Sequence, residues 1–512
     1  MSYNKVVCIL AAGTGSRVQP LSNDINKVLF PLDNKAVIDH IISKFSEDYE
    51  IIIAIGYKGE MVREYCNVTY PNRNIKFVEI DKFEGEGTGP SYSINQCKAY
   101  LQRPFIWVVG DIFIPGNIPA LDRDWLGVSL TNIPELYSTV KIKNNKIISF
   151  KNKDKKGYPY AFVGLANVYD YQTFWKELDV NSGEIVSAYY NIRKYKNMLP
   201  IEIDWHDTGC IDSYIRAKKF FDQSKKYDLP KINGEFLYKS KNKIIKLSKN
   251  KQSIHQRIQR SKLLKPFVPK LTFKGSHLFA YQWVNGQTLY EVSDLSIWKN
   301  FLVFAKKNLW KPENKKKANF KKFYYDKTFE RLTLFLKNRD SNFNDQHTVN
   351  GINTPPIHVL LDQFKWETLY DGLSTKLFHG DMQFDNIIYT TDQQFSFIDW
   401  RQDFAGSDIG DVYYDLAKLY GGILLSYKFI KNKDTFSCVV NQNTVEYRHS
   451  TDQNLCKFQP IFEQWVQKNE FDLHKIKSLA ALIWLNMAPL HEREVGDLLF
   501  FKSKQLLEKL TH

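Results

Sequence analysis

Over its first 111 residues the chain alternates short apolar runs with segments of helical periodicity. The apolar runs occupy residues 6–10, 50–56, 75–80 and 104–111, and the helical segments between them occupy residues 37–45, 59–66 and 90–101. Short runs that are apolar on both faces, joined by helices, are typical of buried parallel strands with crossover connections. The alternation therefore predicts an α/β domain with a mostly parallel, Rossmann-like sheet at the N-terminus.

The first apolar run leads directly into a glycine-rich turn, LAAGTGSR, at residues 10–17. Glycines at this point let the backbone approach a polyphosphate closely, and the amide groups of such a turn favour negative charge. The turn is followed by Arg17, by Pro20 and Leu21, and by Lys27 ahead of the run LFPL. We expect the nucleotide to bind along the turn, at Leu10, Ala11, Ala12, Gly13, Thr14 and Gly15.

This run resembles the signature of the sugar-phosphate and choline-phosphate nucleotidyltransferase family, L-A-A-G-x-G-[ST]-R followed by P-[LM]-[ST] and P-K-x-L-x-P. The resemblance extends to about Phe221. It implies that Arg17 and Lys27 are catalytic residues that neutralise the triphosphate, with Lys27 holding phosphates through the transfer. The sequence departs from the family pattern at Asn26, where the family usually has proline.

Two aspartates add the metal ligands that the turn lacks. Asp111 ends the apolar run WVVGD, and Asp207 lies in WHDTG, which is similar to the family's W-x-D-x-G. Carboxylates from separate strand ends can hold Mg²⁺ against a triphosphate, so we expect both to be metal ligands. Asp207 could instead cap a helix over residues 211–221. The implied reaction is attack of a substrate phosphate oxygen on the α-phosphorus, with pyrophosphate departing.

Three further candidates in this region have an open alternative. The segment EGEGTGPS, residues 84–91, lies where the family contacts base and sugar, so Gly87 and Thr88 are candidate nucleotide-binding residues; its glycines could equally form a structural turn. Glu184 lies where many relatives place an acid near the substrate, and could equally be a solvated acid at a helix start. Trp205, like Trp400 further on, is a candidate substrate contact or a core residue.

A second signature begins at His379 with HGDMQFDNII and ends with FIDW at Trp400. Phosphoryl transfer to an alcohol needs a carboxylate near the hydroxyl and metal ligands that bridge the phosphates. The spacing resembles the aminoglycoside phosphotransferase and choline/ethanolamine kinase family, H-[GN]-D-x-x-x-x-N with I-D-[WFY]. The resemblance implies that Asp381 is the catalytic base or hydroxyl orienter, that Asn386 and Asp399 bind Mg²⁺, and that His379 buttresses the loop. It also implies an α+β, bilobal, protein-kinase-like fold.

The small lobe of this second domain departs from the protein-kinase pattern. Lys246, in KIIKLS, is the best candidate for the lysine that binds the ATP phosphates. Its usual glutamate partner is missing, because no acidic residue occurs between Glu235 and Glu291. The preceding segment GEFLYKS is not glycine-rich, so the phosphate-covering loop must work differently.

The polar stretch before residue 232 separates the two patterns. We expect a nucleotidyltransferase domain over residues 1–222, a linker over 223–231, a kinase small lobe over 232–290 and a mostly helical large lobe over 291–512, which a polar loop over 338–356 interrupts. The length of 512 residues allows several cores. No apolar run reaches the roughly 18 to 20 residues of a membrane span. The N-terminal residues lack the pattern of a secretory signal, so we expect a cytoplasmic protein.

The net charge of +15 is uneven, with thirteen Lys and Arg residues against one acid between Lys231 and Lys274. A lysine-rich solvated face together with a triphosphate site accounts for this charge. Nucleic-acid binding is the less favoured interpretation, because no nucleic-acid-binding motif accompanies the basic residues.

Together the two signatures predict a bifunctional enzyme that uses Mg²⁺. ATP would phosphorylate a small alcohol or sugar, and the product would be coupled to a nucleoside monophosphate from an NTP, with CTP favoured. The result would be a nucleotide-activated precursor for surface polysaccharide or lipid decoration. Two alternatives stay open: an active kinase with a non-catalytic nucleotide-binding regulatory domain, and a sugar-1-phosphate nucleotidyltransferase with a sugar kinase, using UTP or GTP. The sequence does not indicate an oligomeric state.

Overall fold

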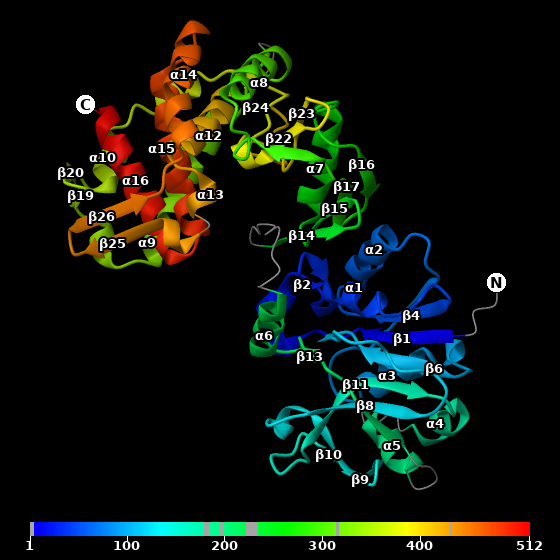
Figure 1. Cartoon of the computed structure of the whole chain (residues 1–512). Helices are drawn as coiled ribbons and strands as arrows, with labels where there is room; N and C mark the ends of the chain where they lie inside the picture. The colour runs from blue at the N-terminus through cyan, green and yellow to red at the C-terminus, as the bar shows by residue number, and fades with distance from the viewer. Residues whose placement is uncertain are drawn as a thin grey trace. The chain divides into compact units, whose positions relative to one another are not determined.

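The computed structural model describes residues 5–178, 185–193, 198–221, 234–313, 317–430 and 432–511. The chain divides into two compact units (Figure 1). The N-terminal unit comprises Met1–Ile254 and Thr272–Tyr281, and the C-terminal unit comprises His255–Leu271 and Gln282–His512. The predicted linker over 223–231 lies outside the described residues.

The N-terminal unit is built on a mixed nine-stranded sheet. Its strands are β1 (Lys5–Ala11), β4 (Tyr49–Ile55), β5 (Ile75–Glu79), β6 (Phe105–Val109), β8 (Trp125–Leu130), β9 (Ser138–Lys143), β10 (Lys146–Asn152), β11 (Tyr160–Val168) and β12 (Leu199–Glu202). Parallel pairing joins β5, β4, β1 and β6, as the apolar runs predict. Beyond β6 the sheet changes character, because β11 is antiparallel to β6, β8 and β9. The predicted parallel sheet is thus confirmed for its first half.

Helices cover both faces of this sheet (Figure 1). They are α1 (Val37–Ile42) and α2 (Gly59–Thr69) on one face, and α3 (Pro90–Gln96), α4 (Tyr171–Glu177) and α5 (Val186–Ile192) on the other. The odd-numbered residues of β1 from Val7 to Ala11 share a core with α1 and α2. The even-numbered residues from Val6 to Leu10 share the other core with α3, α4 and α5. Successive side chains of a strand point to opposite faces, so an uninterrupted apolar run fills both cores.

A second sheet of four strands, in the order β14-β15-β17-β16, packs against the same unit. Its strands are β14 (Glu235–Ser240), β15 (Lys243–Ser248), β16 (Leu271–Lys274) and β17 (Leu278–Gln282). The buried ring of Tyr238 lies 4.9 Å from that of Tyr65 in α2, and its hydroxyl donates a hydrogen bond to the Leu29 carbonyl at 2.5 Å. These strands fall within the region predicted as a kinase small lobe, yet they share a hydrophobic core with the nucleotidyltransferase sheet.

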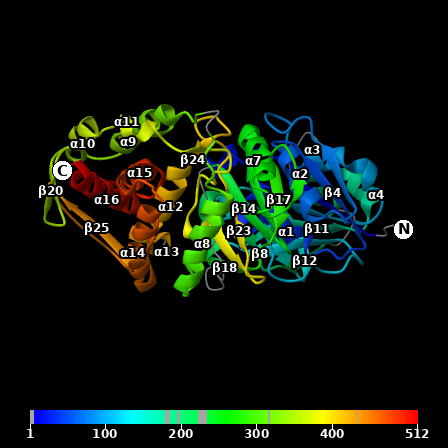
Figure 2. The same ribbon diagram turned by 90° about the horizontal axis from the view of Figure 1, so that it is seen from above.

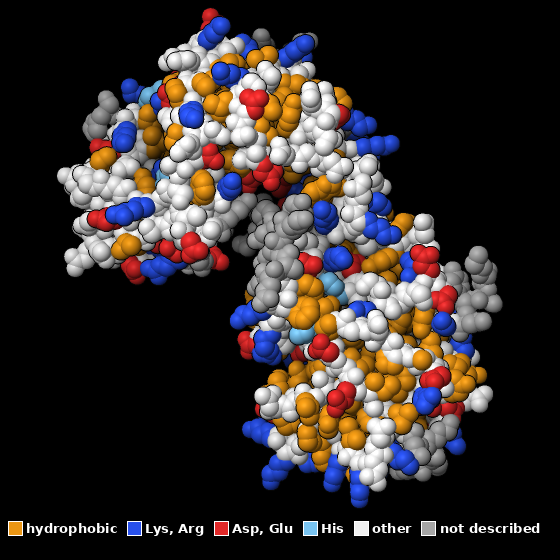
Figure 3. All heavy atoms as spheres, viewed as in Figure 1, with side chains coloured by type: hydrophobic (Ala, Val, Ile, Leu, Met, Phe, Trp, Pro, Cys, Tyr) orange, Lys and Arg blue, Asp and Glu red, His pale blue; other side chains and the backbone are white. Residues whose placement is uncertain are grey.

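Some of the lysines near this second sheet are paired with acids of the N-terminal unit. Lys249 contacts Asp24 at 2.5 Å, and Lys251 contacts Glu60 at 2.8 Å. Exposed lysines gather elsewhere on the unit, on the hairpin of β9 and β10 and in the loop that follows it; they are Lys141, Lys143, Lys146, Lys153, Lys155 and Lys156. Figure 3 shows Lys and Arg side chains along the lower edge of this unit. The basic stretch of the sequence is therefore partly neutralised where it folds.

The C-terminal unit is largely helical. Its longer helices are α8 (Leu295–Asn308), α9 (Lys327–Lys337), α12 (Val412–Leu424), α14 (Gln453–Lys468), α15 (Leu473–Met487) and α16 (Arg493–Thr511). In both ribbon views α15 lies beside α12 and α16 (Figures 1 and 2). Residues Val412 to Ile423 of α12 are all buried, which makes α12 the centre of this unit. Among the described residues, no helix has the length and apolar character needed to cross a membrane.

Two small sheets complete the C-terminal unit. The first contains β18 (Gly286–Thr288), β22 (Ile387–Thr390) and β23 (Phe395–Phe397), and it carries the second signature. The other contains β19 (His347–Val349), β20 (Ile352–Thr354), β25 (Phe436–Asn441) and β26 (Thr444–His449). The polar loop predicted over 338–356 does interrupt the helices, but it also contains a hairpin of β19 and β20 that was not predicted. Three-residue strands are too short for a sequence pattern, and β19 gains a partner from the distant β26.

Candidate functional sites

The glycine-rich turn follows β1 as predicted, and its second glycine is required by the backbone. Gly15 has a φ of 69°, in the left-handed region that favours glycine. A Cβ atom there would lie 3.1 Å from a Val18 methyl group and 3.2 Å from the Ser22 Cβ. The Ser22 hydroxyl donates to the Gly15 carbonyl at 2.9 Å, which fixes the end of the turn.

Asn26, the residue that departs from the family pattern, is fully buried and ties three segments together. Its side-chain amide donates to the carbonyls of Ala11 at 2.9 Å and Tyr57 at 2.6 Å. Its side-chain oxygen accepts from the Val28 amide at 3.0 Å and so caps the turn that carries Lys27. Hydrogen bonds of the Asn26 side chain thus fix the turn that carries Lys27, at the place where the family usually has proline.

Lys27 and Asp111 form a salt bridge of 2.6 Å at the carboxyl end of the central strands. Asp111 is only 8% exposed. Burial opposes its ionisation, but the positive charges of Lys27 and Arg17 outweigh this and hold the pKa of Asp111 below its usual value. The lysine and the aspartate that the sequence placed 84 residues apart are therefore direct partners.

Asp207 lies beside Asp111 because β13 (His206–Asp207) pairs with β7 (Ile112–Phe113). Its carboxylate accepts hydrogen bonds from the Gly209 amide at 2.8 Å and from the Tyr137 hydroxyl at 3.2 Å. Burial and the neighbouring charge of Asp111 raise the pKa of Asp207. Two carboxylates with pKa values displaced in opposite directions therefore face one another at this site.

Gly209 marks the point where these groups converge. A Cβ atom on Gly209 would lie 2.8 Å from Asp111 Oδ2, 2.9 Å from Asp207 Oδ1 and 3.1 Å from Arg17 Nη2. Mg²⁺ binds protein carboxylate oxygens and completes its shell with water and phosphate oxygens, so this pair of aspartates fits the ion. Arg17, Lys27, Asp111 and Asp207, predicted from separate parts of the sequence, are thus brought to one place.

A pocket of about 420 Å³ opens next to the glycine-rich turn. Its lining contains Thr14 and Thr88, two of the predicted nucleotide-binding residues; the other lining residues are Ser16, Gln19, Tyr57, Phe83, Glu84 and Gly85. Gly87 neighbours the pocket at a φ of 74°. Gln19, Tyr57 and Tyr137 were not foreseen, and no sequence spacing marks them. Trp205 is half-buried with its ring 5.3 Å from that of Tyr137, and Glu184 lies outside the described residues.

The second signature forms a loop that α12 holds in place. The amides of His379 and Gly380 donate to the two oxygens of Asp415 at 2.8 and 2.7 Å. The His379 ring bridges the Ile398 carbonyl, at 2.9 Å from Nε2, and the Asp381 amide, at 3.2 Å from Nδ1. Burial lowers the pKa of His379 to about 4, so the ring is neutral and serves to position the loop, as predicted.

Asp381, Asn386 and Asp399 are brought together by this loop. The Asn386 amide group donates to the Asp381 carbonyl at 2.9 Å and to its carboxylate at 3.2 Å. The Ile398 amide donates to the Asn386 carbonyl at 3.0 Å, which places Asp399 next to Asn386. Asp399 itself has a φ of 58°, a backbone conformation that non-glycine residues seldom adopt outside functional or turn positions. An amide and two carboxylates so arranged could hold Mg²⁺.

The sequence missed the closest partner of Asp381. Lys418, in the buried helix α12, contacts the Asp381 carboxylate at 2.8 Å. Burial works against ionisation of Asp381, but the charge of Lys418 more than compensates and lowers the pKa of Asp381. Lys418 follows Asp381 by 37 residues, at no spacing that the signature defines.

Lys246 and Trp400, the other two residues predicted for the kinase site, are buried. Lys246 lies on β15 in the N-terminal unit and is 7% exposed. Trp400 is 1% exposed, and its indole nitrogen donates to the Arg257 carbonyl at 2.9 Å. The surroundings of Trp400 are those of a core residue.

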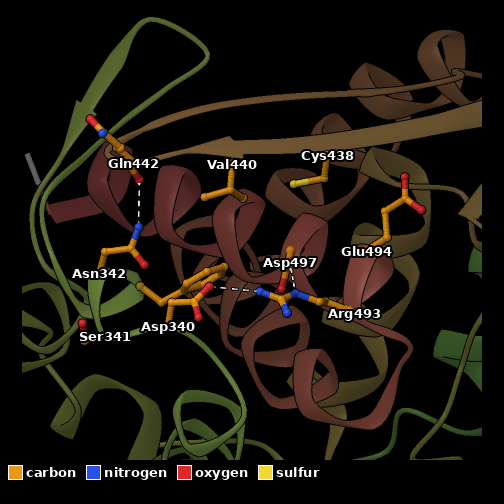
Figure 4. Close-up of a pocket in the computed structure, with 10 residues that line it drawn as sticks. Asp340, Ser341, Asn342, Cys438, Val440, Gln442, Arg493, Glu494 and Asp497 are labelled. Carbon is orange, nitrogen blue, oxygen red and sulfur yellow. Dashed lines mark hydrogen bonds and ion pairs between the residues drawn. The ribbon is translucent and has the colours of Figure 1, made fainter.

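A separate cavity of about 640 Å³ in the C-terminal unit contains none of the predicted site residues (Figure 4). Three of its charged side chains pair with one another, because Arg493 contacts Asp340 at 3.1 Å and Asp497 at 4.0 Å. Cys438 also lines it, and burial raises the pKa of its thiol to about 12. The cavity is structurally distinct from the two signature sites.

Residues 6–121 match the nucleotidyl transferase family. The bifunctional protein GlmU of Methanococcus vannielii is 25% identical over 44% of this chain and 56% of its own length. The D-glycero-alpha-D-manno-heptose 1-phosphate guanylyltransferase of Campylobacter jejuni is 25% identical over 28% of this chain and 67% of its own. The structure of the CTP:phosphocholine cytidylyltransferase from Streptococcus pneumoniae aligns at 20% identity over 43% of this chain and all of that one, with a TM-score of 0.36.

The chain spans 35% to 56% of the length of the GlmU proteins of M. vannielii and M. maripaludis that it matches. The matched segment contains the glycine-rich turn, Arg17, Lys27 and Asp111. The N-terminal unit therefore carries a nucleotidyl transferase domain.

Proposed function

We propose that this protein is a bifunctional enzyme with one reaction in each unit. The C-terminal site phosphorylates a small alcohol or sugar with ATP, and the N-terminal site couples the product to a nucleoside monophosphate with release of pyrophosphate. The observation that carries the proposal is the assembly of Arg17, Lys27, Asp111 and Asp207 around Gly209.

In the N-terminal reaction, a phosphate oxygen of the substrate attacks the α-phosphorus of the NTP. The bond from the α-phosphorus to the bridging oxygen breaks, and pyrophosphate leaves with the electron pair. Arg17 and Lys27 neutralise the phosphates and orient them for this displacement. Mg²⁺ held by Asp111 and Asp207 would withdraw charge from the phosphate oxygens.

In the C-terminal reaction, the hydroxyl oxygen of the acceptor attacks the γ-phosphorus of ATP. The bond between the γ-phosphorus and the bridging oxygen breaks, ADP leaves, and Asp381 orients the hydroxyl and accepts its proton. The lowered pKa of Asp381 keeps this carboxylate ionised. Asn386 and Asp399 would hold Mg²⁺, which would supply positive charge to the ATP phosphates.

CTP is the favoured NTP, because the nucleotidyltransferase pattern ends near Phe221 without the added repeats that many sugar nucleotidyltransferases carry. The product would then be a CMP-activated precursor for surface polysaccharide or lipid decoration.

A second candidate is a sugar-1-phosphate nucleotidyltransferase with a sugar kinase. The names of two relatives favour it: the heptose 1-phosphate guanylyltransferase of C. jejuni, and the UTP--glucose-1-phosphate uridylyltransferase AglF of Haloferax volcanii, 22% identical over 112 residues. This candidate would use GTP or UTP in place of CTP.

The test is to incubate the full chain with Mg²⁺, ATP, one of CTP, UTP or GTP, and a panel of alcohols, sugars and their phosphates. Pyrophosphate and ADP release are followed separately, and nucleotide-linked products are identified by mass. We expect pyrophosphate release with a phosphorylated acceptor and ADP release with an unphosphorylated one. Pyrophosphate release without ADP release would leave only the nucleotidyltransferase, and ADP release alone would favour a regulatory N-terminal domain.

A further inference from the structure

Positive charge lies next to Asp381, the proposed hydroxyl-orienting carboxylate. Lys418 contacts Asp381 directly, at 2.8 Å, with its side chain only 7% exposed. Asp399, in contrast, has Arg257 as its cationic neighbour at 3.9 Å. The hydroxyl-binding and metal-binding carboxylates of this site therefore have different cations beside them.

Two more cations share one aromatic ring near the loop that carries Asp381. The Lys327 ammonium lies 4.1 Å from the ring centroid of Phe323, and the Arg401 guanidinium lies 5.0 Å from the same centroid. Among the described residues, neither Lys327 nor Arg401 has a carboxylate within ion-pair distance. They contact aromatic rings and, for Arg401, the Asp403 carbonyl.

Arg401 is anchored to the loop that carries Asp381. Its amide donates to the His379 carbonyl at 3.0 Å, and its Cβ lies 2.6 Å from where a Cβ on Gly380 would be. The Lys327 ammonium lies over the same Phe323 ring as Arg401, and 5.8 Å from the ring centroid of Tyr414 in α12. Burial, and then the charges of Arg401, Lys418 and Arg331, lower its pKa well below the usual value, while Asp381 opposes this.

Cations collected in a partly buried site without counter-ions repel one another and lose hydration, which is unfavourable unless an anion completes the site. Asp381 is the one carboxylate that neutralises part of this charge, and it is shared with Lys418. A quaternary ammonium acceptor would meet Lys327 and Lys418, where it would be repelled. A carboxylate or phosphate would gain charge-assisted hydrogen bonds from the same side chains.

We propose that Lys327 and Arg401, with Lys418 behind them, form an anion subsite for the acceptor, so that the alcohol phosphorylated at Asp381 carries a carboxylate or phosphate of its own. This inference rests on the proposed kinase function of the C-terminal site. It assigns the acceptor to the class of anionic alcohols and removes choline from it. Lys327 binds the acceptor in this account and takes no part in proton transfer.

The experiment compares four probes of similar size: D-glycerate, sn-glycerol 3-phosphate, the neutral glycerol and the cationic choline. Binding to the full chain is measured by calorimetry with Mg²⁺ and a non-hydrolysable ATP analogue, and ADP release is measured with ATP. The variants are Lys327→Met, the charge-keeping Lys327→Arg, and Lys322→Met, which removes an exposed lysine of the same segment. Thermal melting of each variant, and nucleotide affinity measured alone, accompany every comparison.

We expect at least one anionic probe to bind more tightly than glycerol, and Lys327→Met to weaken that binding on the order of ten-fold. Lys327→Arg should retain most of it, and Lys322→Met all of it, with nucleotide affinity unchanged throughout. The proposal is overturned if neither anion binds more tightly than glycerol, if choline binds best, or if Lys327→Met weakens nucleotide binding and spares the anions.

The binding and ADP arms separate the two claims. If anion binding depends on Lys327 but no probe causes ADP release from ATP, the anion subsite is supported and the kinase function is removed. If glycerol or choline causes ADP release that Lys327→Met does not change, the kinase is supported and the subsite is overturned. If Lys327→Met melts early, Arg401→Gln is measured in its place, and the same outcomes apply.

Discussion

The two sites of this chain each pair a lysine with an aspartate, at 2.6 Å for Lys27 and Asp111 and at 2.8 Å for Lys418 and Asp381. The surroundings of the two pairs differ. In the N-terminal site a second carboxylate, Asp207, shares the space with Asp111, and its pKa is raised. In the C-terminal site further cations surround the pair, and the pKa of Asp381 is lowered.

The difference indicates two uses of the same ion pair. Two carboxylates beside one lysine suit a divalent metal and a triphosphate, because the added positive charges are neutralised by both acids and by the phosphates. In the C-terminal site the second carboxylate, Asp399, has Arg257 beside it at 3.9 Å, and Lys418 pairs with Asp381. This arrangement suits a base that stays ionised next to an anionic ligand. Under the proposed function, the pair binds phosphate in one site and sets the pKa of the base in the other.

The strongest test of this comparison removes each aspartate in turn. Asp111→Asn should lower pyrophosphate release on the order of 10²- to 10³-fold and leave ADP release unchanged. Asp381→Asn should lower ADP release by about 10²- to 10⁴-fold. It should leave unchanged the pyrophosphate release from the NTP when a phosphorylated acceptor is supplied. Both rates are measured on each variant after its melting temperature has been shown to match the original. Loss of both activities in one well-folded variant would contradict separate sites.

Gly209→Ala tests the convergence of the N-terminal groups. The added Cβ would lie within 3.1 Å of Asp111, Asp207 and Arg17, so these side chains must move apart. Because displacement of about 1 Å at a reacting centre can cost roughly 100-fold in rate, we expect pyrophosphate release to fall by about that factor. Gly116→Ala, at a glycine of the same unit with nothing within 4 Å of its Cβ position, is the control and should keep full activity. An unchanged rate in Gly209→Ala would show that the three groups do not act at this point.

Lys418→Met tests the base-tuning role of the C-terminal pair. Lys418 lowers the pKa of Asp381, so its removal should raise that pKa and protonate the base at a higher pH. The acid side of the pH profile of ADP release should therefore move to higher pH, with partial recovery of the rate at alkaline pH. Lys418→Arg should keep the original acid limb. A uniform loss of rate at every pH would instead indicate that Lys418 only supports the structure.

Asn26→Ala tests how the turn that carries Lys27 is held. It removes two donated hydrogen bonds and one accepted bond in a fully buried place. Leaving such partners unsatisfied costs about 1–3 kcal/mol, so the free energy of unfolding should fall by that order. Denaturant unfolding measures the change, and Asn26→Pro separates the roles: it restores the family residue but not the hydrogen bonds to Ala11 and Tyr57. Equal stability of Asn26→Ala and the original chain would contradict the account.

Tyr238→Phe has the smallest expected effect. It removes the hydroxyl that donates to the Leu29 carbonyl and keeps the ring against Tyr65. We expect a loss of about 1 kcal/mol in the free energy of unfolding, with both activities retained. Tyr238→Ala should cost about 3–5 kcal/mol by emptying a core position. Little difference between Tyr238→Ala and the original would mean that the second sheet is not part of this core.

In the N-terminal half, the sequence predicted best the elements that show both a clear hydrophobic pattern and a phosphate-binding motif or a helix pattern beside one. The strand β1, the turn that follows it and helix α6 (Ile211–Phe221) lie where their sequence patterns predict them. Arg17 and Lys27 could be predicted because the signature fixes their spacing, and Asp111 and Asp207 because each lies in a short motif of its own, WVVGD and WHDTG. The antiparallel strands around β11 could not, because a strand's direction depends on partners far along the chain.

In the C-terminal site, the sequence predicted only the residues that belong to the signature. Asp381, Asn386 and Asp399 follow from their spacing, but Lys418 and Lys327 come from helices α12 and α9, whose lysines look like any others in the sequence. Likewise, no pattern in β14 or β15 signals that Tyr238 packs against Tyr65. Contacts between distant segments decide these features, and local periodicity does not encode them.

Complementation between two variants that each lack one of the two activities tests the central claim most directly. Asp111→Asn and Asp381→Asn are each incubated, and then mixed, with Mg²⁺, ATP, CTP and an acceptor alcohol, and nucleotide-linked products are identified by mass. Two independent sites predict no product from either variant alone and product from the mixture, because the phosphorylated intermediate made by Asp111→Asn is used by Asp381→Asn. A mixture that forms no product, although each variant keeps its one remaining activity, would contradict the account.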